Sequence, residues 1–112
     1  MKLHYNEQQE NIEDADQYIG KHLLVGLTYR DDNGDVIKRV QLHGIITRIT
    51  KEGIFIERAD GKGEFTLPSD LESLEPTIPG AEYRLNTTGE VVRDADYMSN
   101  WTIDVPPEED KE

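Results

Sequence analysis

The sequence predicts a mainly β fold, a small barrel of five short, strongly bent antiparallel strands with one helical turn before the fifth. Residues 22–30 alternate apolar and polar side chains, which is the period of a half-buried strand. An Asn-Gly pair at 33–34 then marks a hairpin turn, because both residue types tolerate positive φ. A second alternating run, 36–50, changes parity at 43–44, and a parity switch at a glycine is typical of a β-bulge.

The parity switch fixes which side chains of the second run we expect to face the core. They are Val36, Val40 and Leu42 before the glycine, and Ile45, Thr47 and Ile49 after it. A bulge at this point would bend the strand sharply, as closing a small sheet into a barrel requires.

Shorter elements complete the expected order. The remaining strands are predicted at 54–58, 64–67, 81–85 and, as a last short strand, 101–105. Residues 68–76 predict one helical turn, which Ser69 or Asp70 can cap and Pro76 ends.

The strand order over residues 22–85 resembles the SH3-like small barrels, including their Sm-like and Tudor-like variants. The resembling features are the bent strand around 42–46, the strand 53–56 and the turn 67–71 before the closing strand. The resemblance concerns the fold and carries no ligand residues, since such barrels support many unrelated functions.

We divide the chain into three parts because its two end segments are more acidic than its centre. The 112 residues include 24 acidic and 12 basic side chains, which gives a net charge of −12 and a pI of about 4.5. We expect residues 1–20 to form an acidic N-terminal arm or short helix and residues 21–105 to form a single β-barrel domain. The proline- and acid-rich residues 106–112 are predicted to be a disordered tail.

Composition excludes several classes of protein. The absence of cysteine excludes disulfides, thiolate zinc sites and thiol catalysis. Apolar runs are far shorter than the roughly 18 residues that a membrane span needs. The N-terminus turns polar at once, unlike a signal peptide. We therefore expect a cytoplasmic protein that has no membrane partner, is monomeric and needs no cofactor.

No enzyme signature is present. The serines are in neither G-x-S-x-G nor S-x-x-K motifs, and the acidic turn 31–35 misses the spacing of a calcium-binding loop. His4, His22 and His43 lack the spacing of a zinc motif, so no catalytic or metal-binding residue is assigned. His43, beside the expected bulge, supports an alternative interpretation, a small-ligand-binding or enzymatic barrel with its site near this residue.

The acidity favours a non-catalytic protein-binding module, of the inhibitor, immunity-protein or adaptor type. Long-range attraction would steer a partner with a basic surface, and tyrosine and tryptophan are enriched in interface cores. The candidate binding residues are Asp94, Asp96, Tyr97 and Trp101. For Trp101, packing inside the domain is the favoured alternative, because a chain with one Trp and two Phe needs its aromatic residues in the core. Nucleic acid is disfavoured, because a net charge of −12 repels phosphate. An Sm-like RNA-binding module is therefore the lowest-ranked alternative.

Overall fold

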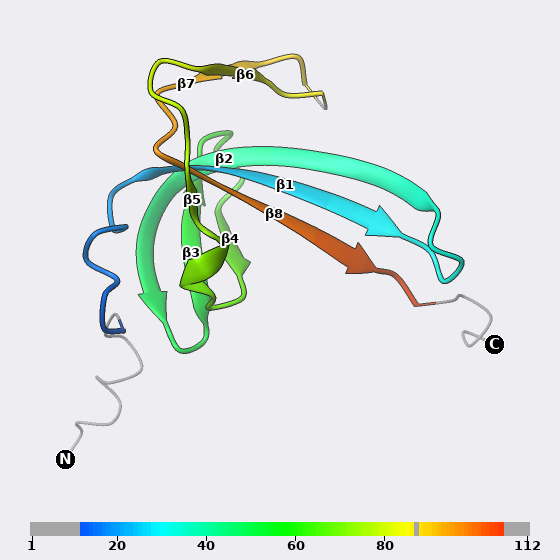
Figure 1. The fold of residues 1–112 in the computed structure, drawn as a ribbon, viewed down its shortest axis with the longest axis horizontal. Coiled ribbons are helices and arrows are strands. Elements are labelled where there is room, and N and C mark those ends of the chain that lie inside the picture. Colours follow the sequence, from blue (N-terminus) through cyan, green and yellow to red (C-terminus); the bar gives the residue numbers. More distant parts are fainter. Residues whose placement is uncertain (1–11, 87, 107–112) are drawn as a thin grey trace.

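A computed structural model describes residues 12–86 and 88–106, and the structural statements below concern these residues. They form a mainly β structure, as predicted (Figure 1). In chain order the elements are β1 (His22–Arg30), β2 (Val36–Thr50), β3 (Gly53–Arg58), β4 (Glu64–Leu67), the 3-10 helix η1 (Leu71–Ser73), β5 (Glu75–Pro76), β6 (Glu82–Arg84), β7 (Val91–Arg93) and β8 (Tyr97–Asp104).

The main sheet has six strands in the order β4-β3-β2-β1-β8-β5. All neighbours are antiparallel except β1 and β8, which run parallel in continuous register from Leu23 and Tyr97 to Arg30 and Asp104. The sheet is mixed and is not a closed barrel, so the predicted five-stranded SH3-like barrel is not confirmed. The strand expected to close it, at 81–85, instead pairs as β6 with β7 in a separate hairpin.

Local signals set the first hairpin and the helical turn where they were predicted. β1 and β2 are joined through Asp31, whose Oδ1 accepts the N–H groups of Asn33 and Asp35 at 2.9 and 3.0 Å. Only Gly34 of the Asn-Gly pair has positive φ. In η1, Asp70 is the cap, one of the two residues predicted for this role, and its carboxylate accepts the N–H of Glu72.

β2 changes face three residues later than predicted. The register with β3 shifts between Ile46 and Arg48, so Ile46 is fully buried whereas Ile45 is 42% exposed. The expectation that Ile45 and Thr47 face the core is therefore wrong. Gly44 serves another purpose, since a Cβ there would lie 2.1 Å from the carbonyl oxygen of Glu57. The glycine permits β3 to approach closely, and the irregularity itself falls at Thr47.

Both faces of the sheet are packed near the start of β1. Leu23, Val25 and Leu27 belong to the main core, which also contains the fully buried Ile46 and Ala15. Ala15 comes from residues 12–20, which form successive turns against this core rather than a helix. The first 11 residues and residues 107–112 lie outside the described part of the chain.

The opposite face is covered by the β6–β7 hairpin. Leu24 points to this face and forms a second, smaller core with Leu85 and Val92. Beyond the reach of β3, the three strands β1, β2 and β8 continue side by side and end at the first hairpin turn (Figure 1). We call this part, residues 26–30, 36–41 and 100–104, the three-stranded extension. No helix in the described residues is long and apolar enough to cross a bilayer.

Candidate functional site

The four predicted binding residues do not form one exposed surface. Asp94 and Asp96 are exposed on the connection between β7 and β8. Tyr97 and Trp101 are half-buried on the core face of β8, where the ring of Tyr97 meets that of Tyr18 at a centroid distance of 5.0 Å. The alternation of residues 97–103 could have indicated this orientation, because odd positions of the strand share one face.

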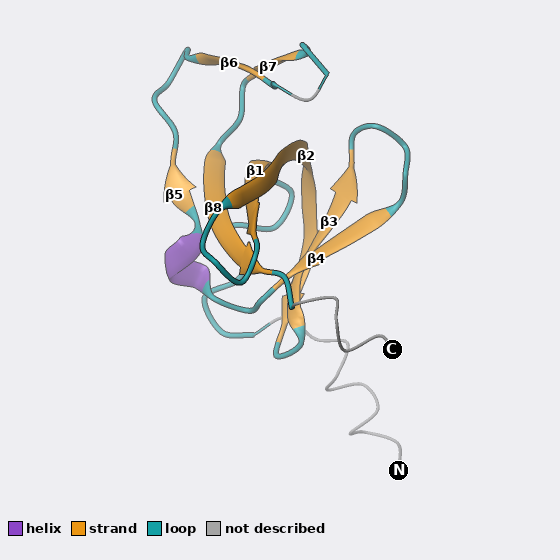
Figure 2. Cartoon of the chain, turned by 90° about the vertical axis from the view of Figure 1, so that its right-hand side faces the viewer, coloured by secondary structure: helices purple, strands orange, loops and turns teal. Residues whose placement is uncertain are grey.

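Buried hydroxyl groups hold Trp101 in place. Its indole N–H donates to Ser99 Oγ at 2.7 Å, and Ser99 Oγ donates to Ser73 Oγ at 3.0 Å. Ser99 is almost fully buried, and Ser73 lies in η1. η1 lies beside β8 (Figure 2). The hydrogen bonds tie these two elements together and account for both serines structurally.

His43 belongs to a chain of hydrogen-bonded groups that runs from β1 to the β6–β7 hairpin. The Nε2 atom of His22 lies 2.8 Å from Nδ1 of His43, and Nε2 of His43 lies 2.9 Å from a carboxylate oxygen of Glu90. At the other end, Nδ1 of His22 lies 3.3 Å from the carbonyl oxygen of Asp94. The His43 side chain is 12% exposed and that of Glu90 50% exposed, so the chain opens to solvent at the glutamate.

Donor and acceptor capacities determine the direction of the two outer hydrogen bonds of this chain. An ionised carboxylate and a carbonyl only accept, so His43 donates to Glu90 and His22 donates to Asp94. In the contact between the two rings one nitrogen donates to the other, and the tautomers of the rings decide which of them is the donor.

This chain fastens the hairpin over the second core. His22 and His43 come from the two paired strands, and Glu90 directly precedes β7. The main-chain N–H of His22 also donates to Asp96 at 3.0 Å. A search for metal-site spacing in the sequence did not reveal the histidine pair. The two residues meet because the β1–β2 register places His43 opposite Leu24 and thus diagonal to His22. Glu90 gave no sequence signal, because it meets His43 only through tertiary packing.

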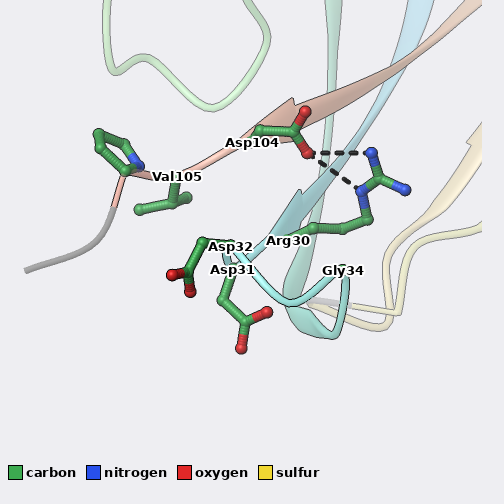
Figure 3. Close-up of a pocket in the computed structure, with 7 residues that line it drawn as sticks. Arg30, Asp31, Asp32, Gly34, Asp104 and Val105 are labelled. Atoms are coloured by element: carbon green, nitrogen blue, oxygen red, sulfur yellow. Dashed lines mark hydrogen bonds and ion pairs between the residues drawn. The ribbon is translucent and has the colours of Figure 1, made fainter.

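A second region, at the end of the three-stranded extension, is an open hollow of about 490 Å³ (Figure 3). We call it the tip hollow. Its lining residues are Arg30, Asp31, Asp32, Gly34, Asp104, Val105 and Pro106. Arg30 donates to one oxygen of Asp104 from Nε at 3.2 Å and from Nη2 at 3.0 Å. The side chains of Asp31 and Asp32 point away from this pair in Figure 3. With three aspartates and one arginine in its lining, the hollow carries more negative than positive charge.

Three arginine side chains outside the tip hollow, those of Arg48, Arg58 and Arg93, lie beside acidic groups. The ion pairs found in the described ranges are Arg30–Asp104, His43–Glu90, Arg48–Glu64, Arg58–Asp60 and Arg93–Glu82. The hydrogen bonds from the Arg58 side chain and from the Lys62 main chain lower the pKa of Asp60 below its ordinary value of 3.8. These pairs leave arginines next to neutralising charges, which disfavours a phosphate-binding surface.

No group of three or more histidine or carboxylate side chains within 12–86 and 88–106 is placed to hold a metal ion. Asp31, part of the acidic turn, instead accepts the turn's own N–H groups.

No protein-family model, curated protein or solved structure matches this chain.

Proposed function

We propose that the protein is a non-catalytic protein-binding module, an inhibitor or adaptor for a partner with a basic surface. The observation that carries this proposal is the tip hollow, whose lining has the three carboxylates of Asp31, Asp32 and Asp104 and only one guanidinium, that of Arg30. Because Arg30 already pairs with Asp104, the other two carboxylates keep their charge available to a cation from outside. The net charge of −12 adds long-range attraction for such a partner.

The chemistry of the tip hollow suits binding better than catalysis. Its lining has no hydroxyl, thiol or imidazole group, so its only groups of catalytic type are carboxylates, which can equally pair with a cation. The imidazole pair at His22 and His43 lies on another part of the sheet and lines no part of this hollow. Charge complementarity with a lysine or arginine side chain is what the tip hollow offers.

The test compares two variants of equal charge. Asp31→Asn with Asp32→Asn removes the tip charges, and asparagine at 31 keeps the oxygen that accepts the turn N–H groups. Glu13→Gln with Asp16→Asn removes the same charge from exposed positions elsewhere. Each tagged protein is incubated with host lysate at low salt, and retained proteins are quantified by mass spectrometry across a salt gradient.

We expect a basic protein that the wild type and the control variant retain and that the tip variant loses. Its release should come at moderate salt, since exposed charges are screened over about 10 Å at 0.1 M. If the tip and control variants retain the same proteins in the same amounts, net charge alone attracts them and the proposed binding role of the tip hollow is rejected.

The histidine chain supports a second candidate function, small-ligand binding beside His43. The observation in its favour is that the chain reaches solvent at Glu90, so a small molecule could compete for the His43 imidazole. A thermal-shift screen of wild type and His43→Gln checks it. A ligand that raises only the wild-type melting temperature supports this candidate, whereas ligands that stabilise both proteins equally reject it.

A further inference from the structure

β8 is paired along its whole length on one side only. On that side β1 matches it residue by residue from Tyr97 to Asp104. On the other side β5 pairs only with Tyr97 and Met98. Within the described residues, 99–104 therefore present an open sheet edge, visible in Figure 1 as the outer side of β8 in the three-stranded extension.

The open edge offers main-chain hydrogen bonds. Just after β8, the N–H of Val105 donates to the carbonyl of Arg30 at 2.8 Å. Successive peptide groups of a strand point to opposite sides, so odd-numbered residues face β1. Asn100, Thr102 and Asp104 consequently direct their N–H and C=O groups to the open side, and their side chains are exposed.

This edge lacks the features by which proteins usually block unwanted strand pairing. Such features are lysines, prolines, bulges and very short strands. The open part of β2 carries Lys38 and Arg39, and the edge strand β4 has only four residues. Along 99–104 the single charged residue is Asp104, and the first proline is Pro106. The open edge of β8 is thus the least protected one in the described sheet.

Acidic groups lie at both ends of the open edge. Glu72 and Glu75 are exposed in η1 and β5 beside the start of β8. The tip hollow, with Asp31 and Asp32, lies at its end. The two acidic groups are separated by the length of a six-residue strand, which is about 20 Å at 3.3 Å per residue. A second copy of this chain would bring another charge of −12 to the same place, so a basic occupant is favoured.

We infer that the open edge of β8 receives an extended, basic segment of the partner as an additional β-strand, an inference that rests on the proposed function. Main-chain bonds to Asn100, Thr102 and Asp104 would hold the segment. Lysine or arginine side chains at its two ends would meet the acidic groups described above. Its residues on the core side would contact the half-buried Trp101 and Ile103, so an alternation of basic and apolar residues fits this edge.

The experiment uses a fluorescent peptide of alternating lysine and valine, and the same peptide with N-methyl groups on every second amide. N-methylation removes strand pairing and keeps the charge. On the protein, Thr102→Pro removes one N–H from the open edge, where proline is tolerated, and Thr102→Val keeps that N–H as the matched control. Binding is measured by fluorescence anisotropy, and protection of the amides of Asn100, Thr102 and Asp104 by hydrogen exchange.

We expect binding to weaken about tenfold with Thr102→Pro and with the N-methylated peptide, since each loses main-chain hydrogen bonds. Thr102→Val should bind as the wild type does, and the edge amides should become protected. If both peptides bind wild type equally while the tip variant Asp31→Asn with Asp32→Asn weakens them, docking at the edge is overturned and the proposed function stands. Absence of binding at low salt, or protected edge amides in a peptide-free dimer, also overturns the inference.

Discussion

Truncating Ile46 and Ile45 separately to alanine tests where β2 changes face. The two residues are adjacent and chemically identical, so differences in composition and in the denatured chain nearly cancel. In the structure Ile46 is fully buried and Ile45 is 42% exposed. The parity switch at Gly44 that the sequence suggested would reverse these two environments.

The expected losses follow from burial. Replacing isoleucine with alanine removes three carbons, worth about 2.4 kcal/mol when fully buried at about 0.8 kcal/mol each. A cavity among the main-core residues around Ile46 adds roughly 1 kcal/mol, so Ile46→Ala should lower the free energy of unfolding by about 3–4 kcal/mol. Ile45 loses about half of the transfer contribution and leaves no cavity, so Ile45→Ala should cost about 1 kcal/mol.

Urea denaturation followed by tryptophan fluorescence measures both values. Trp101 is the only tryptophan and is half-buried against the main core, so its emission reports the loss of the core. Equal slopes of the free energy against urea concentration would show that the denatured states are comparable. Equal losses for the two variants, or a larger loss for Ile45→Ala, would refute the register shift at Thr47.

Two further predictions concern close packing and a surface ion pair. Gly44→Ala should cost about 3 kcal/mol or more, because its Cβ would clash with the main chain of Glu57; Gly80→Ala, with φ of +82° and no atom within 4 Å, should cost only about 1–2 kcal/mol. Equal costs in urea denaturation would contradict the close approach of β2 and β3. The lowered pKa of Asp60 means that its ionised form favours the folded state, a contribution present above the unfolded pKa and lost as pH falls through the folded pKa. Carboxyl NMR should show Asp60 titrating below 3.8, and Arg58→Gln should raise that midpoint; an unchanged midpoint would reject Arg58 as the cause.

Local sequence patterns predicted the elements that local interactions determine. The alternation of 22–30 gave β1 with the observed bounds, and the acidic Asn-Gly turn gave the first hairpin. The glycine at 44 was misinterpreted, because an alternating pattern does not distinguish a bulge from a close approach of two strands. The pairing of β8 with β1 had no local signal, since Arg30 and Asp104 are 74 residues apart in the chain.

In the candidate sites, too, the sequence indicated single residues of interest but not the long-range contacts that they make. His43 was predictable as a residue of interest, but its partner Glu90 lies in a hairpin that covers the sheet only in the folded structure. Tyr97 and Trp101 were proposed as binding residues because of their type, with core packing favoured for Trp101, and the structure packs both half-buried rings against the main core. The tip hollow combines the first hairpin turn with the end of β8, a combination that depends on the same long-range parallel pairing.

That parallel pairing can form only late in protein synthesis, because β8 is synthesised long after β1. At about 5–20 residues per second, a ribosome needs roughly 4–15 s to advance the 74 residues from Arg30 to Asp104. Throughout this interval the nascent β1–β2 hairpin has no neighbour for the far side of β1, and its apolar Leu23, Val25 and Leu27 lack part of their core. A ribosome that stalls before β8 would therefore leave a long, apolar strand edge exposed, and we expect such truncated chains to aggregate rather than fold.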